Sequence, residues 1–266
     1  MTDQGPQRIV CLTEETTEWL YLLGQDWRIV GISGYTVRPR RARQEKPRVS
    51  AFLDGKIDRI VELKPELVIG FSDMQAALAD KLIRAGLNVL VTNQRSIEEI
   101  LATLRMVAGL VGAQAAAEAW IGTCRARLDD LRRAAQGWSR RPRVYFEEWD
   151  EPMISAIRWV SELIEVAGGE DVFAELGRMP MGRDRVIADA SEPLRRAPDI
   201  LVGSWCGKKF RPEKVAARPG WDAMPAVRDG ELHEIKSCDI LQPGPAALTD
   251  GVERLHALFA RWAAER

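Results

Sequence analysis

Residues 96–138 read SIEEILATLRMVAGLVGAQAAAEAWIGTCRARLDDLRRAAQGW, and this stretch decides the fold. From Ala113 to Gln136 it contains no proline and only one glycine, Gly122, while apolar side chains recur every three or four residues. That spacing predicts one long helix with a continuous apolar face, and Gly112 separates it from a shorter helix. At about 1.5 Å per residue, some two dozen helical residues span roughly 35 Å, which is enough to join two small domains.

Short apolar runs alternate with helical patterns on both sides of this stretch. Before it, we expect strands at residues 8–12, 28–32, 67–71 and 88–92, with helices at 19–23, 57–63 and 76–85. After it, we expect strands at 143–146, 200–203 and 231–235, with helices at 159–167 and 246–264. Strands that alternate with helices on short connections indicate parallel sheets covered by helices.

A weak internal repeat supports two related halves. Residues 65–70, PELVIG, match residues 198–203, PDILVG, and in each case a proline ends a helix before a strand begins. We therefore predict an α/β protein with two Rossmann-like lobes, each with a parallel sheet, joined by one long backbone helix, with the ligand cleft between the lobes. The expected parts are an N-terminal lobe at 1–95, a helical linker at 96–138 and a C-terminal lobe at 139–266.

The composition narrows the class of protein. The chain has 266 residues, 46% of them hydrophobic, which is enough for one large core or two small ones. A net charge of −1 argues against a nucleic-acid binder, because such proteins neutralise phosphates with a surplus of Lys and Arg. No apolar run approaches the roughly 20 residues that span a bilayer, so we expect no membrane insertion. No signal-peptide pattern follows Met1, so we expect a cytoplasmic protein, or a periplasmic one if the native start was trimmed.

Aromatic and polar residues gather where the expected strands end, and open α/β sheets bind ligands at that edge. These residues are Thr13, Tyr35, Phe52, Trp149, Trp159, Trp205, Cys206 and Gly207. Aromatic rings supply contact area at a small entropic cost and suit a flat or macrocyclic ligand. Trp149 and Trp205 fit a ligand-binding wall and core packing equally well. Core packing is expected for the tryptophans within helical patterns, which are Trp19, Trp120, Trp138 and Trp262.

An acidic cluster follows the expected strand at 143–146. It consists of Glu147, Glu148, Asp150 and Glu151. Carboxylates can bind a metal ion or act as a general acid and base, but a solvated loop rim explains the cluster more simply. No GxSxG motif is present, and the scarcity of histidine leaves serine and cysteine without an activating base. The sequence therefore favours a binding protein over an enzyme.

Metal and disulfide chemistry has little support. The four cysteines are scattered without a CxxC pair, which indicates neither a zinc site nor a disulfide framework. A site that combines His233 with Cys206 or Cys238 is the one metal-binding alternative. We expect no metal site.

Two segments are candidates for binding an anion. GSWCGKK at 203–209 resembles a phosphate-binding loop, but only three residues separate its glycines where that loop needs four. Lys209 also occupies the position of the magnesium-binding hydroxyl, so nucleotide hydrolysis is not predicted, although Lys208 remains a candidate for an anion contact. The basic loop from Arg38 to Arg48 is the second candidate, for an anionic ligand group or a partner.

Several segments together carry a family resemblance. They are RIVCLTEETTEWLYLLGQDWRIVGISGY at 8–35, PRVSAFLDGKIDRIVELKPELVIG at 47–70, the long helix, RPGWDAMPAVRDGELHEI at 218–235 and LQPGPAALTDGVERL at 241–255. In this order they resemble substrate-binding proteins of the helical-backbone class, and most specifically the cobalamin-binding members that serve vitamin uptake transporters. The resemblance covers nearly the whole chain.

This resemblance implies that cobalamin is the ligand and that aromatic rings hold it. The matching positions are Tyr35, Phe52, Trp149, Trp159 and Trp205, with Thr13 on the first loop. The resemblance also implies docking to an ABC transporter permease through one acidic residue on each lobe, here Asp58 and Glu192. We therefore expect a non-enzymatic carrier or buffer for cobalamin or a related corrinoid. The alternatives are a binder of another metal chelate, haem or a ferric siderophore, and a small enzyme that uses Glu147 and Glu148.

Overall fold

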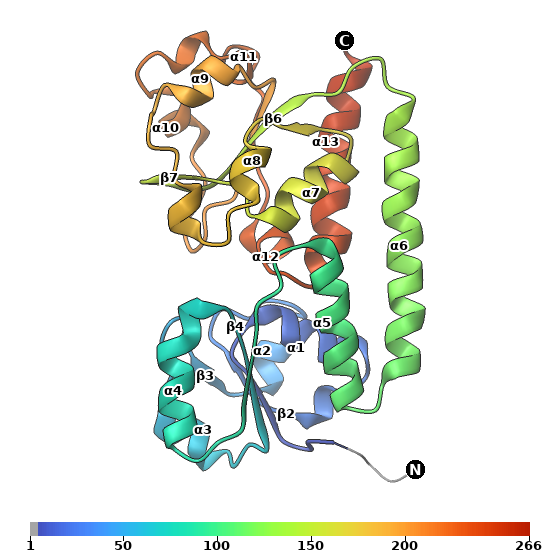
Figure 1. Cartoon of the computed structure of the whole chain (residues 1–266), viewed down its shortest axis with the longest axis vertical. Helices are drawn as coiled ribbons and strands as arrows, with labels where there is room; N and C mark the ends of the chain where they lie inside the picture. The colour runs from blue at the N-terminus through green and yellow to red at the C-terminus, as the bar shows by residue number, and fades with distance from the viewer. Residues whose placement is uncertain (1–4) are drawn as a thin grey trace. The chain divides into compact units, whose positions relative to one another are not determined.

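A computed structural model describes residues 5–266 of the chain (Figure 1). The chain forms two compact units: the first comprises residues up to Gln94 together with Glu98–Gly122, and the second comprises Arg95–Ile97 and Thr123–Arg266. Helix α6 (Gln114–Gln136), the long green helix of Figure 1, is continuous across the boundary between the units. The stretch expected as a separate helical linker is therefore shared between the two units.

The first unit is built on a sheet of five parallel strands in the order β3-β2-β1-β4-β5. The strands are β1 (Ile9–Cys11), β2 (Ile29–Ser33), β3 (Arg48–Ser50), β4 (Leu67–Phe71) and β5 (Val89–Thr92). The accompanying helices and 3₁₀ turns are α1 (Glu14–Leu22), η1 (Asp26–Arg28), α2 (Ala42–Glu45), α3 (Ile57–Glu62), η2 (Asp73–Gln75), α4 (Ala76–Arg84) and α5 (Ile97–Leu110). Apolar runs form the central strands β1 and β4 because both faces of these strands are buried.

The core of the first unit consists of aliphatic side chains from the sheet, α3 and α4. Its buried members are Val10, Leu12, Val49, Ile60, Val68, Leu78 and Leu82. Helix α1 contacts α5 and α6 through Trp19, whose indole N–H donates to the carbonyl of Leu104 at 2.9 Å. The ring of Trp19 meets the ring of Trp120 edge-on, with centroids 5.1 Å apart. The predicted packing role of these two tryptophans is confirmed.

The second unit has a sheet in the order β10-β9-β6-β7, with β8 beside β6. The strands are β6 (Arg143–Asp150), β7 (Met153–Ser155), β8 (Glu170–Asp171), β9 (Ile200–Gly203) and β10 (Leu232–Glu234). The helices and turns are α7 (Arg158–Val166), α8 (Ala174–Gly177), η3 (Gly182–Arg185), α9 (Glu192–Arg196), α10 (Pro212–Ala216), η4 (Trp221–Ala223), α11 (Pro225–Arg228), α12 (Ser237–Ile240), η5 (Ala247–Gly251, π-helical) and α13 (Val252–Ala264). The sheet is parallel as predicted, apart from β7, which runs antiparallel to β6.

An aromatic cluster forms much of the core of the second unit. Its largest buried members are Tyr145, Phe173, Trp205, Phe210 and Trp221. Trp262 of α13 is buried as well. Trp138 follows the end of α6, and the centroid of its ring lies 5.2 Å from that of His256 on α13. The expected packing role of Trp138 and Trp262 is therefore confirmed as well.

The main departure from the expected elements is the length of β6. The strand continues to Asp150, so Glu147, Glu148 and Trp149 lie within it rather than in a loop. Strand β7 pairs antiparallel with this extension and satisfies its backbone groups. A local pattern assigns charged residues to solvent, whereas in the folded unit these carboxylates have cationic partners.

The remaining departures are mostly short elements that the sequence pattern does not predict, among them β3, β7 and β8. Strand β3 begins at Arg48, which we had placed at the end of a basic loop, and the last helix begins with a π-helical turn. Within residues 5–266, no helix is both long enough and apolar enough to cross a bilayer.

Candidate functional site

In the first unit, several predicted site residues follow the carboxyl ends of neighbouring strands. Thr13 comes after β1, Tyr35 after β2 and Phe52 after β3. Because these strands are parallel, their carboxyl ends share one edge of the sheet. The strand order reverses at β1, which lies between β2 and β4, and open α/β sheets bind ligands at such a reversal. This edge is the candidate site of the first unit.

Thr13 is buried and is committed to an internal contact. Its hydroxyl donates to Oε1 of Glu15 at 2.6 Å, and Oε2 of Glu15 is buried without a hydrogen-bond partner among the residues that the structure describes. Burial raises the pKa of Glu15 to about 7. Burial also raises the pKa of Glu14 to about 7, although Glu14 accepts the N–H of Val37 at 3.2 Å. Glu14 and Glu15 therefore begin α1, with Glu14 partly buried and Glu15 buried.

Tyr35 and Phe52 present aromatic rings at this edge. The side chain of Tyr35 is 55% exposed, while that of Phe52 is half-buried. The loop that carries Phe52 is held in place because the backbone carbonyl of Phe52 accepts a hydrogen bond from Nε2 of Gln75 at 2.7 Å. Gln75 in turn accepts the N–H of Phe71 at 2.9 Å, which connects the loop to the end of β4. The exposed Tyr35 and the firmly held Phe52 are both suited to contact a ligand.

In the second unit, Glu147 is the centre of a buried hydrogen-bond network. Its carboxylate is fully buried and accepts both terminal nitrogens of Arg218, at 2.6 and 2.9 Å. It also accepts the indole N–H of Trp205 at 3.0 Å and the hydroxyl of Tyr145 at 2.9 Å. Burial, together with the neighbouring carboxylate, raises the pKa of Tyr145 well above its ordinary value. Glu147 is thus a structural anion rather than a free acid or base.

Trp149 and Lys208 lie next to this network at the ends of β6 and β9, where Trp149 is partly exposed and Lys208 is exposed. The Lys208 ammonium lies 4.0 Å from the centroid of the Trp149 ring and 5.1 Å from that of Trp205, and it pairs with Asp150. The indole N–H of Trp149 donates to the carbonyl of Glu151 at 2.8 Å, and its ring is half-buried. Trp149 therefore has a fixed orientation and keeps part of its ring exposed.

Two of the predicted ligand contacts lie in the core of the second unit. Trp159 is only 2% exposed and donates its indole N–H to the carbonyl of Ile240 at 3.0 Å. Trp205 is 4% exposed and meets Phe210 edge-on, with centroids 5.0 Å apart. Of the two interpretations that the sequence allowed for Trp205, the structure favours packing, since both its ring and its N–H have internal partners.

Cys206 and Gly207 follow Trp205 at the exposed end of β9. Both residues are exposed, and Gly207 adopts the left-handed conformation with φ +77°. A residue with a Cβ is strained in that conformation, so the glycine sets the direction of the loop. The ligand contacts expected of these two residues stay predictions.

The structure also bears on the enzyme and metal alternatives. Glu148 accepts two hydrogen bonds from the buried guanidinium of Arg185, at 2.7 and 3.1 Å, so both acidic candidates of the proposed enzyme loop are ion-paired. His233 contacts Glu231 at 2.6 Å. In the part of the chain that the structure describes, no three His, Cys, Asp or Glu side chains are arranged to hold a metal ion.

The two expected docking residues differ in their surroundings. Asp58 lies exposed in the first turn of α3. Glu192 lies at the start of α9, where it pairs with Arg195 and with Arg196, the latter at 2.8 Å. Hydrogen bonds from these arginines hold the pKa of Glu192 below its ordinary value. A partner would meet an exposed carboxylate at Asp58, which has no ion pair within residues 5–266, and a neutralised one at Glu192.

Sequence reasoning missed the cationic partners of the second unit. Arg218 and Arg185 lie 71 and 37 positions from the carboxylates that they neutralise. No periodicity or spacing connects residues so far apart. The one available signal was that Glu147 directly follows an apolar strand. If the strand continued, this carboxylate would be buried and would need a counter-charge.

The two α/β units, which share a long helix and carry aromatic rings at their strand ends, define a class of ligand-binding proteins. A sequence model of the periplasmic binding protein family matches residues 9–237. The chain belongs to this family, whose members bind ligands rather than catalyse reactions.

Individual relatives agree with this assignment. The vitamin B12-binding protein of Vibrio parahaemolyticus is 23% identical over 95% of this chain and 90% of its own. An uncharacterized ABC transporter substrate-binding lipoprotein of Bacillus subtilis is 24% identical over 94% and 79%. The periplasmic vitamin B12 binding protein of Vibrio cholerae superposes with a TM-score of 0.75 at 22% identity, covering 98% of this chain and 99% of that one. A periplasmic heme-binding protein of Pseudomonas aeruginosa gives a TM-score of 0.80 at 22% identity, over 97% and 94%. The predicted fold is confirmed.

Proposed function

We propose that this protein binds cobalamin or a related corrinoid, with Tyr35, Phe52 and Trp149 as aromatic contacts. The observation that carries the proposal is the aromatic residue Tyr35, which is 55% exposed just after the end of β2, beside the reversal of strand order. Several relatives that align with most of this chain are named vitamin B12-binding proteins, which supports a corrinoid as the ligand. In the second unit, Trp149 is partly exposed and its indole N–H is held by the carbonyl of Glu151, which suits it to contact a large macrocycle.

Haem is the second candidate ligand. Solved structures of the same fold include heme-binding proteins of Roseiflexus and Pseudomonas aeruginosa. A haem is also a flat macrocycle, so the same exposed rings suit it. The absorption spectrum of the bound ligand distinguishes the two candidates.

The decisive experiment mixes the purified protein with hydroxocobalamin and, in parallel, with hemin, and then removes unbound ligand by desalting. We expect the cobalamin sample to elute red, with near-equimolar ligand and a shifted spectrum. Retention of hemin alone would transfer the proposal to haem. A colourless protein in both samples would contradict both candidates.

We also propose that an ABC transporter permease is a partner, contacted through Asp58. The exposed carboxylate of Asp58 on α3 can pair with a cationic residue of another protein. The matched control is Glu62 on the same helix, which is exposed as well. If the proposal holds, Asp58→Asn weakens co-purification with a permease supplied in detergent, whereas Glu62→Gln leaves it unchanged. An equal effect of the two substitutions would contradict a specific role of Asp58.

A further inference from the structure

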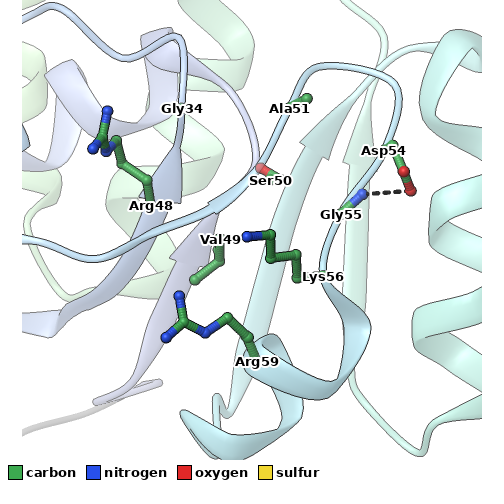
Figure 2. Close-up of a pocket in the computed structure, with 9 residues that line it drawn as sticks. All are labelled: Gly34, Arg48, Val49, Ser50, Ala51, Asp54, Gly55, Lys56 and Arg59. Atoms are coloured by element: carbon green, nitrogen blue, oxygen red, sulfur yellow. Dashed lines mark hydrogen bonds between the residues drawn. The ribbon is translucent and has the colours of Figure 1, made fainter.

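A cavity lies in the first unit, on the edge strand of the sheet. It has a volume of about 440 Å³ and is bounded by β3, the loop after it and the start of α3 (Figure 2). The lining residues are Gly34, Arg48, Val49, Ser50, Ala51, Asp54, Gly55, Lys56 and Arg59. A cavity of this volume holds a small molecule.

The lining is strongly basic. Arg48, Lys56 and Arg59 all line the cavity and are exposed, and none of them has an acidic partner within residues 5–266. The one acidic lining residue, Asp54, accepts the N–H of Gly55 at 2.8 Å. Elsewhere on this protein arginines are paired repeatedly, as Arg84 is with Asp80 and Arg105 with Glu118. Three unpaired cations around one cavity therefore form a site of positive potential.

Figure 2 shows how the cations are presented. Lys56 and Arg59 extend from the loop and from α3 toward Val49, and Arg48 projects on the side of Gly34. The backbone beneath them is held by the N–H of Lys56, which donates to the carbonyl of Val49 at 3.0 Å, and by that of Ala51, which donates to Asp54 at 2.7 Å. The charges are thus carried by a folded loop rather than a loose one.

The Ser50 hydroxyl is an independent sign of a ligand. Ser50 lines the cavity and is only 8% exposed, and its Oγ is buried without a hydrogen-bond partner among the described residues. Buried hydroxyls in folded proteins nearly always have a partner, so an unsatisfied one calls for a group that the protein alone does not supply. An oxyanion accepts a hydrogen bond from a hydroxyl and from guanidinium groups alike.

We propose that this cavity binds a phosphate group, either free or carried on a small organic molecule. Two guanidinium groups and one ammonium match the charge and the several acceptor oxygens of a phosphate better than the single charge of a carboxylate. The site lies wholly within the first unit and uses none of the aromatic residues proposed to contact the corrinoid. The cavity adjoins the proposed corrinoid contacts, since Gly34 and Ala51 directly precede Tyr35 and Phe52, but phosphate binding is a separate activity of its own basic lining.

The test is calorimetric titration of the whole protein with inorganic phosphate and, separately, with glycerol 3-phosphate, in a non-phosphate buffer of low salt. The variants are Arg59→Gln and the double variant Arg48→Gln/Lys56→Gln. The control is Lys81→Gln, which removes one exposed charge from α4 outside the cavity. We expect Arg59→Gln to weaken binding roughly tenfold, the double variant to abolish it and the control to bind like the unmodified protein.

The two probes separate the possible sources of the phosphate. Tighter binding of glycerol 3-phosphate supports a phosphorylated small molecule, and tighter binding of inorganic phosphate supports the free ion. Absence of heat with both probes, or equal weakening in Lys81→Gln, would overturn the proposal. Hydroxocobalamin retention is measured on the same proteins, so a failure of phosphate binding is distinguishable from a failure of corrinoid binding.

Discussion

At the scale of single residues, the carboxylate of Glu147 is a fully buried anionic group at the centre of a hydrogen-bond network in the second unit. It accepts hydrogen bonds from Arg218, Trp205 and Tyr145 and has no contact with solvent. An ion pair in this setting is costly to break, because the remaining charge keeps its desolvation penalty without its partner. The network aligns the ends of β6 and β9, which carry Trp149 and the loop with Lys208.

Glu147→Gln should therefore lower the free energy of unfolding by about 3 kcal/mol, because it leaves the Arg218 guanidinium without its charged partner. Urea denaturation measures the difference. The control is Glu165→Gln, which breaks an exposed pair with Arg141 and should cost less than about 1 kcal/mol. Equal losses in the two variants would contradict the central role of the buried network.

Tyr35→Ala should affect ligand binding without affecting stability. Its ring is 55% exposed, so truncation removes little buried area, whereas a ring that covers a ligand contributes about tenfold or more in affinity. Corrinoid titration and thermal unfolding measure the two effects. Ile83→Ala on α4, where the side chain is 59% exposed, is the matched control and should change neither. Unchanged affinity in Tyr35→Ala would remove this residue from the site.

The buried glutamates of α1 make stability depend on pH. Burial raises the pKa values of Glu14 and Glu15 from 4.5 to about 7. The folded protein therefore holds protons that the unfolded chain releases, and the free energy of unfolding should fall as pH rises from about 5 to about 7. Glu15→Gln should flatten this slope, whereas Glu62→Gln, at an exposed position of α3, should retain it. Denaturant titrations at several pH values give the slopes, and an unchanged slope in Glu15→Gln would contradict the assignment.

At the scale of elements, the ring of Phe210 packs against the end of β9 only because Gly203 has no side chain. A Cβ there would lie 1.9 Å from Cδ2 of Phe210, which itself packs on Trp205. By contrast, a Cβ at Gly122 of α6 meets no atom of residues 5–266 within 4 Å. Glycine is thus required at position 203 to leave room for Phe210, whereas position 122 can accept a side chain.

Gly203→Ala should destabilise the protein by roughly 1–3 kcal/mol, because Phe210 must leave its packed position. Gly122→Ala should stabilise it by about 0.5–1 kcal/mol, because alanine loses less backbone entropy than glycine in a helix. Thermal or urea denaturation of both variants tests the pair. A loss of stability in Gly122→Ala would show that α6 has a neighbour at that position.

At the scale of the whole molecule, each unit has its own sheet and its own hydrophobic cluster. A local defect should therefore open the unit that contains it before the other. In Gly203→Ala, hydrogen exchange should accelerate in β6 and β9, while β1 and β4 keep their protection. A uniform increase across both sheets would mean that the units unfold as one.

Much of this architecture could be predicted from the sequence. The strands Leu67–Phe71 and Ile200–Gly203 agree with the expected bounds, since a short apolar run next to a proline is a local signal. The long helix was expected from its periodicity alone, and the structure has it as Gln114–Gln136. The resemblance that pointed to a ligand-binding family agrees with the family match over residues 9–237.

The candidate site was predictable only in part. Tyr35 and Trp149 are exposed or partly exposed at strand ends, as a ligand contact must be. Trp159 and Trp205 are also aromatic and were also expected near strand ends, but they are buried. Which way a ring points depends on neighbours that are distant in sequence, since Ile240 lies 81 positions from Trp159 and Glu147 lies 58 positions from Trp205.

The main strands, the long helix and their order could be predicted from the sequence, because apolar periodicity, glycine and proline act within a few residues of the chain. The short strands β3, β7 and β8 could not. Only the tertiary structure decided that Glu147 is a buried anion and that Arg48, Lys56 and Arg59 surround one cavity. The physical reason is that the energy of a charge depends on its burial and on partners brought close by folding. Arg218 neutralises Glu147 from 71 positions away, and no local pattern encodes that distance.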